Sequence, residues 1–164
     1  MNTPATVVDD RNGPIVVLGD EQRRQIQALA ATAPVWPILG FLAGRHSKAT
    51  VEGGYKVIVT HALEGNYLLH SYGRPLWTAA TLRDAKERAK QPATCKSCCL
   101  VGWLFSQPGW GVYVTDDDLA FHRGYFRAAW KIFIGVDPIR RKAEIFGWSA
   151  DCERIVKLEH DWKW

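Results

Sequence analysis

The chain has 164 residues, of which 47% are hydrophobic and 23% are charged, and its formal net charge is +4. This length fits one domain with a sizeable core, and the composition is that of an ordinary globular protein. The excess of Lys and Arg is too small to indicate nucleic-acid binding, and no apolar run approaches the roughly 20 residues that span a bilayer. The N-terminus lacks the segments of a signal peptide, so we expect a cytoplasmic protein without nucleic-acid or membrane partners.

Residues 1–12 are polar and are expected to be flexible, and residues 13–164 are expected to form one domain. Apolar periodicity, helix-forming residues and turn residues then predict a series of strands and helices. In chain order these are a strand at 15–18, a helix at 21–32, a strand pair at 38–43 and 55–63, a helix at 81–90, a strand at 100–105, a helix at 115–126, and strands at 131–136 and 144–148. Because helices are mixed with strands that need not be parallel, the sequence predicts an α/β fold with a mixed sheet flanked by helices.

Acidic residues mark the starts of two of these helices. Asp20 is expected to cap the first helix, because its carboxylate can accept hydrogen bonds from the N–H groups of the first turn. Thr115 is followed by three aspartates, residues 116–118, whose charge is the sign that the helix dipole favours at an N-terminus. Both patterns indicate where a helix begins.

The segment 101–118 carries the most informative motif. It reads Val-Gly-Trp-Leu-Phe-Ser-Gln-Pro-Gly-Trp-Gly and continues Val-Tyr-Val-Thr-Asp-Asp-Asp. This resembles the signature of JAMM (JAB/MPN) metalloproteases, in which a strand ending in Gly-Trp leads to His-x-His-Pro, a Gly-rich turn, a Ser or Thr, and an Asp that opens a helix. Residues 40–44 are similar to the family's Gly-Leu-Leu-x-Gly strand, residues 130–138 to its strand ending in Val-Asp-Pro, and residues 122–126 to the His-Arg-x-Phe segment of bacterial members. The resemblance implies a single MPN/JAB-type domain with cytidine-deaminase-like layering.

The residues at the family's catalytic positions depart from its pattern. In the family, two His and one Asp bind zinc, a Glu acts as general base and a Ser stabilises the oxyanion. The resemblance places Phe105 and Gln107 at the His positions and Pro37 at the Glu position, while Asp118 keeps the Asp and Thr115 replaces the Ser. Phe and Pro offer no ligand or proton-transfer group, and a Gln amide is a poor zinc ligand. The resemblance therefore implies no metal, no cofactor and no protease activity.

Two functions remain open on these residues. Inactive MPN domains bind and scaffold other proteins, so the implied partners are another MPN-type subunit, a second copy of this chain, or a ubiquitin-like or carrier protein. Trp110, Gln107 and Asp118 are the candidate binding residues, since Trp is enriched at interface hot spots, although Trp110 is equally well explained as a lid over the former metal cavity. The alternative is an enzyme with a rebuilt, zinc-independent hydrolase or small-molecule site, in which Asp118, Thr115, Ser106 and Gln107 converge.

The four cysteines are expected to be reduced thiols, because no export signal is visible. Cys95 and Cys98 form a C-x2-C pair, which Cys152 and His160 could complete as a structural zinc site. The other interpretation is that these cysteines are small buried apolar side chains beside a strand start.

Trp162 and Trp164 lie at the end of the chain, among eight tryptophans in all. They can fold back on the core or present an apolar surface to a partner, and packing is the slightly favoured interpretation. Trp suits both roles, because its ring buries a large apolar area and its N–H needs a polar partner.

Overall fold

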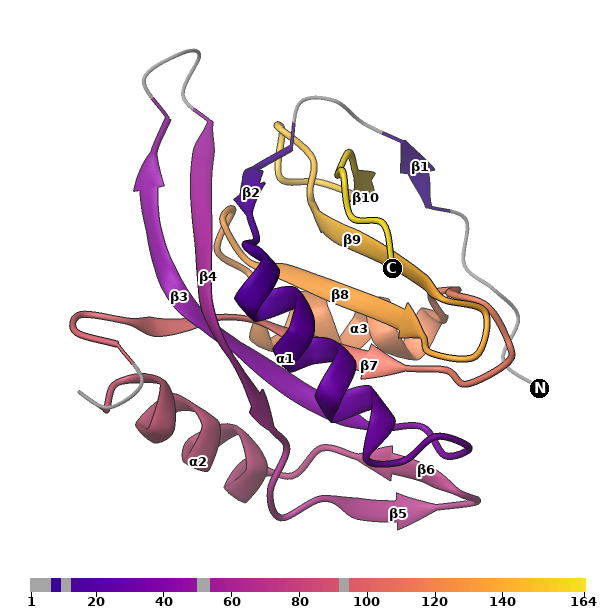
Figure 1. Cartoon of the computed structure of the whole chain (residues 1–164). Helices are drawn as coiled ribbons and strands as arrows, with labels where there is room; N and C mark the ends of the chain where they lie inside the picture. The colour runs from indigo at the N-terminus through magenta and orange to yellow at the C-terminus, as the bar shows by residue number, and fades with distance from the viewer. Residues whose placement is uncertain (1–6, 10–12, 50–53, 92–94) are drawn as a thin grey trace.

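The computed structural model describes residues 7–9, 13–49, 54–91 and 95–164. In this part of the chain, a large curved sheet carries α1 on one face and α2 and α3 on the other (Figure 1). The helices are α1 (Asp20–Ala31), α2 (Ala79–Ala89) and α3 (Asp116–Tyr125). The strands are β1 (Val8–Asp9), β2 (Ile15–Val17), β3 (Leu39–Lys48), β4 (Tyr55–Glu64), β5 (Leu69–Ser71), β6 (Arg74–Leu76), β7 (Cys99–Ser106), β8 (Ile132–Asp137), β9 (Lys142–Trp148) and β10 (Ile155–Leu158).

The main sheet has eight strands in the order β1-β10-β9-β8-β7-β3-β4-β2. Strands β1 and β10, β7 and β8, and β2 and β4 pair in parallel, and the other neighbours are antiparallel. Strands β5 and β6 form a separate two-stranded sheet beside it. At Gly102 the parallel strand β8 approaches so closely that a Cβ would lie 2.1 Å from the Ile132 carbonyl oxygen. The glycine of the Gly-Trp motif is therefore required by the sheet itself.

Each face of the sheet has its own apolar core. The α1 face includes Ile26, Leu42 and Leu104, whereas the face under α2 and α3 includes Phe41 and Trp103. Neighbouring residues of one strand thus belong to opposite cores, because successive side chains point to opposite faces. This explains why residues 39–44 of β3 and residues 100–106 of β7 are buried on both faces and why both segments are mainly apolar.

The predicted mixed α/β fold is confirmed at this level, with strands and helices at the expected places. The prediction missed β1, β5, β6 and β10, which are short and lack an extended pattern. The prediction that Asp20 caps α1 is wrong. Gly19 occupies the N-cap without a side-chain hydrogen bond, and Asp20 is already the first residue of the helix. None of the described helices is long and apolar enough to cross a membrane.

Both ends of the described chain lie against the sheet. Of the segment expected to be flexible, residues 1–6 and 10–12 lie outside the described residues, while Val8–Asp9 forms β1 beside β10. At the other end, Trp162 is buried in the core on the α1 face. Its ring stacks on that of Trp164 with 6.0 Å between centroids, and the Arg141 guanidinium donates to the Trp164 carbonyl. The two tryptophans therefore pack onto the domain.

Candidate functional site

The residues at the JAMM-like positions gather where β7 ends, beside the start of β3. Leu39 of β3 is in register with Phe105 of β7. Just beyond this pair, the Ser106 N–H donates to the Ile38 carbonyl at 3.0 Å, and the Ile38 N–H donates to the Ser106 hydroxyl at 3.0 Å. Pro37 precedes Ile38, so the structure brings the Glu position of the motif next to the strand that carries the first His position.

Phe105, at the first His position, is part of the apolar core. Its ring is only 4% exposed and lies 5.5 Å from the ring of Trp103 and 6.4 Å from that of Phe133. It also covers Gly135 of β8, where a Cβ would lie 2.6 Å from both Phe105 Cζ and Val112 Cγ1. The space that an imidazole would need for a metal is therefore filled by packed carbon atoms.

Gln107, at the second His position, is buried and bonded to the backbone of its own loop. Its amide nitrogen donates to the Tyr113 carbonyl at 3.0 Å, and its amide oxygen accepts from the Tyr113 N–H at 3.0 Å. The loop between them bends at Gly109 and Gly111, whose φ angles of +80° and +77° suit glycine. Gln107 thus closes a loop, because its amide nitrogen and its amide oxygen both form hydrogen bonds with the backbone of Tyr113.

Thr115 and Asp118 form a capping box at the start of α3. The Asp118 N–H donates to Thr115 Oγ1 at 3.2 Å, while Asp118 Oδ2 accepts from the Thr115 N–H at 2.9 Å and from its hydroxyl at 2.7 Å. Burial raises the pKa of the Asp118 carboxyl, and the Thr115 hydrogen bonds and the charge of Arg74 oppose that shift. The helix start predicted at Thr115 is confirmed, and both side chains serve to hold it.

A buried carboxylate that sequence reasoning missed organises the same loop. The side chain of Asp137 is fully buried and accepts from the N–H groups of Gly109 at 2.8 Å, Gly111 at 2.6 Å, Ile139 at 3.0 Å and Arg140 at 3.0 Å. Burial opposes its ionisation, but these backbone donors outweigh burial and hold the pKa of the carboxyl below its usual range. In the sequence, this carboxylate could have been recognised from the Asp137-Pro138 pair that ends an apolar strand.

Trp110 lies between the two glycines that Asp137 binds. Its side chain is 76% exposed, an exposure that fits a contact residue better than a lid. Because Gln107 and Asp137 fix the loop on both sides, the indole is presented on a rigid support. Ordering such a residue on binding costs little entropy.

A groove begins at Pro37 and runs between the end of α1, the start of β3, the end of β4 and the β5–β6 hairpin. It has a volume of about 580 Å³, and its lining includes Leu29, Trp36, Pro37, Leu39, Tyr67 and Leu68. Trp36 and Tyr67 are 63% and 67% exposed. In Figure 1, the loop after α1 lies beside this hairpin, and a Cβ on Gly73 would lie 3.4 Å from the Trp36 ring. Sequence reasoning missed the groove because it depends on β5 and β6.

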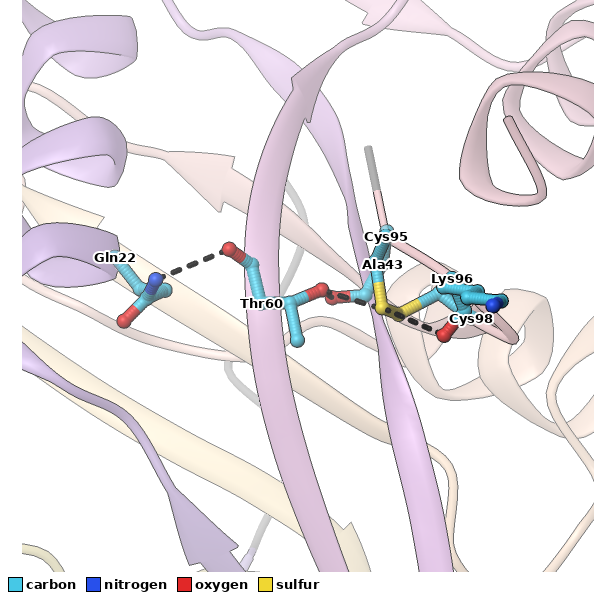
Figure 2. The surroundings of a disulfide bond; sticks show 6 residues. All are labelled: Gln22, Ala43, Thr60, Cys95, Lys96 and Cys98. Carbon is cyan, nitrogen blue, oxygen red and sulfur yellow. Dashed lines mark hydrogen bonds between the residues drawn. A yellow bond between two sulfur atoms is a disulfide. The ribbon is translucent and has the colours of Figure 1, made fainter. Parts of the chain in front are cut away.

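The cysteines differ from expectation. Cys95 and Cys98 are joined in a disulfide with their Cα atoms 5.4 Å apart, so the prediction of reduced thiols is wrong for this pair (Figure 2). Ser97 takes a φ of +65°, which folds the loop and brings the two sulfurs together. Cys152 is an exposed thiol, and His160 lies 3.3 Å from the carboxylate of Glu144.

The structure therefore does not gather the proposed zinc set of Cys95, Cys98, Cys152 and His160. Within the described residues, no group of three or more His, Cys, Asp or Glu side chains is placed to hold a metal ion. The glutamate beside His160 instead forms an ion pair with Lys157 at 2.9 Å.

A scan against protein-family models finds no model that matches the chain, and a search of curated proteins finds no similar sequence. The likeness to JAMM/MPN domains therefore stays a prediction from the order of the motifs at 40–44, 101–118 and 130–138.

Introducing the ligands of the JAMM motif at the matching positions is expected not to create a metal site. In the triple variant Phe105→His, Gln107→His and Pro37→Glu, we expect zinc far below one per chain, because Phe105 occupies an apolar space and the Asp118 carboxylate is bonded to Thr115. Metal analysis of the purified wild type and variant measures this. One zinc per chain in the variant, lost again on adding Asp118→Asn, would contradict it.

Proposed function

We propose that this chain is a catalytically inactive, JAMM/MPN-like domain that binds another protein. The observation that carries the proposal is that the polar side chains at the motif positions are bonded to the chain itself. Ser106 bonds to Ile38, Gln107 to Tyr113, and Asp118 to Thr115. The other two positions are the apolar Phe105 and Pro37. A hydrolase needs a base and an electrophile aimed at a substrate, and these contacts use the groups for structure instead.

The groove beside Pro37 supports binding as the function. The described part of its lining holds one carboxylate, Glu64, and one imidazole, His70, among mainly apolar side chains. Trp36 and Tyr67 both line the groove and are largely exposed. Large exposed aromatic side chains grouped around a hollow are typical of binding sites, because they bury much area for few frozen torsions.

The occupant that fits this groove is an extended, apolar segment of a partner protein. A hollow receives a protruding chain more readily than a flat surface does, and the lining offers few charges to recognise a charged ligand. A ubiquitin-like or carrier protein that offers such a segment is the proposed partner. Another MPN-type subunit and a second copy of this chain are the other outcomes of the test.

The test compares two variants of the full chain. In Trp36→Ala with Tyr67→Ala, we expect the affinity for the partner to fall at least about tenfold, since hot-spot truncations cost more than about 1 kcal/mol each. The control is Tyr125→Ala, which removes an exposed ring from the end of α3 and should leave the affinity unchanged. A partner captured from the native host by wild type is purified and titrated against all three proteins by calorimetry.

Light scattering on the same samples distinguishes a second copy from a different protein as the partner. Equal affinity of wild type and the groove variant for the purified partner would contradict the assignment of the groove. If light scattering shows a dimer that only the groove variant loses, the occupant is a second copy.

The alternative is a zinc-independent hydrolase or small-molecule site around Asp118. The raised pKa of Asp118 favours it, since a general base working near neutrality needs such a shift. The two hydrogen bonds that Asp118 Oδ2 accepts from Thr115 disfavour this alternative, because they fix the carboxylate at the helix start. Hydrolysis of a peptide or ester by wild type, lost in Asp118→Asn with α3 intact by circular dichroism, would support the alternative.

A further inference from the structure

The Cys95–Cys98 disulfide closes a ring of only four residues at the start of β7. A cross-link stabilises a fold chiefly by restricting the unfolded chain, and the effect grows with the length of the loop it closes. Both cysteines here belong to one loop, so the bond joins no two separate elements. Strands β3 and β8 already hold β7 on its two sides through main-chain pairing. The disulfide therefore contributes little to the stability of the fold.

The two cysteines differ in their exposure to solvent. Cys95 is partly exposed, and its neighbours Lys96 and Ser97 are exposed, whereas Cys98 is buried. Figure 2 shows the disulfide beside Ala43 of β3, and the Cys98 sulfur lies 3.4 Å from the hydroxyl of Thr60 on β4. In thiol–disulfide exchange, the reachable sulfur is attacked and the shielded one leaves. The exposure of the two residues therefore favours attack at Cys95 and departure of Cys98.

Thr60 of β4 provides a partner for the sulfur that leaves. Its hydroxyl lies 3.4 Å from Cys98 Sγ and 3.1 Å from the Ala43 carbonyl oxygen. A hydroxyl has one proton, so donation to Ala43 leaves its lone pairs for an S–H donor. A reduced Cys98 can donate to them, whereas a disulfide sulfur has no proton to give. The Thr60 backbone is held in place by Gln22, whose amide donates to the Thr60 carbonyl at 3.0 Å (Figure 2).

The remaining two cysteines are placed differently. Cys99 points toward the core on the α1 face, and burial raises the pKa of its thiol, against the charges of Lys131 and Lys90. It therefore stays protonated and is a poor nucleophile near neutral pH. Cys152 is exposed in the turn between β9 and β10, outside the Cys95 loop. Replacing both by serine leaves the pair under test unchanged.

We propose that Cys95 and Cys98 form a thiol–disulfide exchange site for the dithiol of a partner protein. A thiolate of the partner attacks Cys95 Sγ, the Cys95–Cys98 bond breaks, and Cys98 leaves as a thiolate that takes a proton from water and bonds to Thr60. The partner's second thiolate then attacks its own sulfur in the mixed disulfide and releases Cys95 as a thiolate. The partner dithiol is oxidised to a disulfide and this chain is reduced by two electrons. A partner that carries a disulfide reverses the reaction.

The test uses the full chain carrying Cys99→Ser and Cys152→Ser, with dithiothreitol as the probe dithiol. Oxidised protein is equilibrated at neutral pH in mixtures of reduced and oxidised dithiothreitol, and alkylated thiols are counted by mass spectrometry. We expect two thiols to appear in the native protein, with unchanged tryptophan fluorescence. Thr60→Val should then require about three- to tenfold more reduced over oxidised dithiothreitol for half reduction, the effect of losing one weak hydrogen bond. The matched control is Thr32→Val, whose hydroxyl donates to the Leu29 carbonyl in its own turn, far from the disulfide, and should cause no shift.

Two outcomes would overturn the proposal, and a third would overturn its assignment of Thr60. Reduction that occurs only after unfolding in urea would show that attack at Cys95 is blocked in the native chain. Reduction that itself unfolds the chain would show that the disulfide is a structural cross-link. An unchanged equilibrium in Thr60→Val would remove Thr60 as the partner of the reduced Cys98.

Discussion

Lowering the pH from 6.5 to 4.5 is expected to cost the folded protein about 2–3 kcal/mol through His122 alone. This imidazole is completely buried between the rings of Phe126 and Phe133, and its Nδ1 accepts from the Trp103 indole N–H at 3.1 Å. Burial first, and then the charge of Lys131, lower the pKa of His122 to about 3. Protonation therefore favours the unfolded chain, whose His has a pKa of 6.5. The stabilisation is complete above pH 6.5 and is lost as the pH falls toward 3.

The measurement is urea unfolding followed by tryptophan fluorescence at several pH values between 7.5 and 4.5. The variant His122→Asn keeps an acceptor for Trp103 but has no proton to gain, so its free energy of unfolding should fall less over this range. The difference in slope isolates His122, because the shifted groups Asp118 and His46 titrate in both proteins. The control is His70→Asn, at an exposed position, which should keep the wild-type slope. Equal slopes in wild type and His122→Asn would show that this imidazole does not resist protonation.

Replacing Asp137 by Asn should lower the free energy of unfolding by about 2–4 kcal/mol at neutral pH. Asn keeps one acceptor oxygen, but its NH₂ group faces a backbone N–H where a carboxylate oxygen accepted one, and four donors lose a charged acceptor. The loop that carries Trp110 should also become mobile, because Gly109 and Gly111 are bound to this carboxylate. Chemical denaturation measures the first effect, and backbone amide exchange at residues 108–112 measures the second.

The pH dependence of the Asp137 effect has a definite sign. The pKa of this carboxyl is lowered in the folded state from the usual 3.8, so its stabilisation is present above about pH 4 and is lost as the pH falls further. The wild type should therefore lose more stability than Asp137→Asn below pH 4. The control is Asp116→Asn at an exposed position in the first turn of α3, which should cost under about 1 kcal/mol. Similar losses for Asp116→Asn and Asp137→Asn would contradict a special role for the buried carboxylate.

His122 and Asp137 stabilise neighbouring parts of the structure, and both bear on the proposed function. His122 and Trp103 fix the core under α3, and Asp137 fixes the loop in front of it. Both lie in the motifs that resemble JAMM proteins, so these motifs have structural reasons to exist that do not involve catalysis. A binding domain needs such a rigid frame to present Trp110, and the groove beside Pro37, in a fixed geometry.

Much of the fold follows from the sequence, and for local reasons. The apolar runs in the first part of β3 and in β7 identify segments buried on both faces, and Thr115 followed by aspartates identifies the start of α3. The absence of imidazoles at Phe105 and Gln107 is likewise visible in the sequence. These features depend on side-chain type and spacing within one segment, which a sequence displays directly.

The candidate sites depend instead on contacts between distant segments, which only the tertiary structure decides. Asp137 accepts from residues 26 and 28 positions before it, and Thr60 meets a sulfur 38 positions after it. The groove joins the end of α1 to a hairpin too short to have a sequence pattern. Composition and periodicity determine which segments form strands and helices, whereas packing determines which polar groups those segments bring within hydrogen-bond distance. That is why the sequence alone shows that positions 105 and 107 carry no imidazole, but not how the polar groups around them are used.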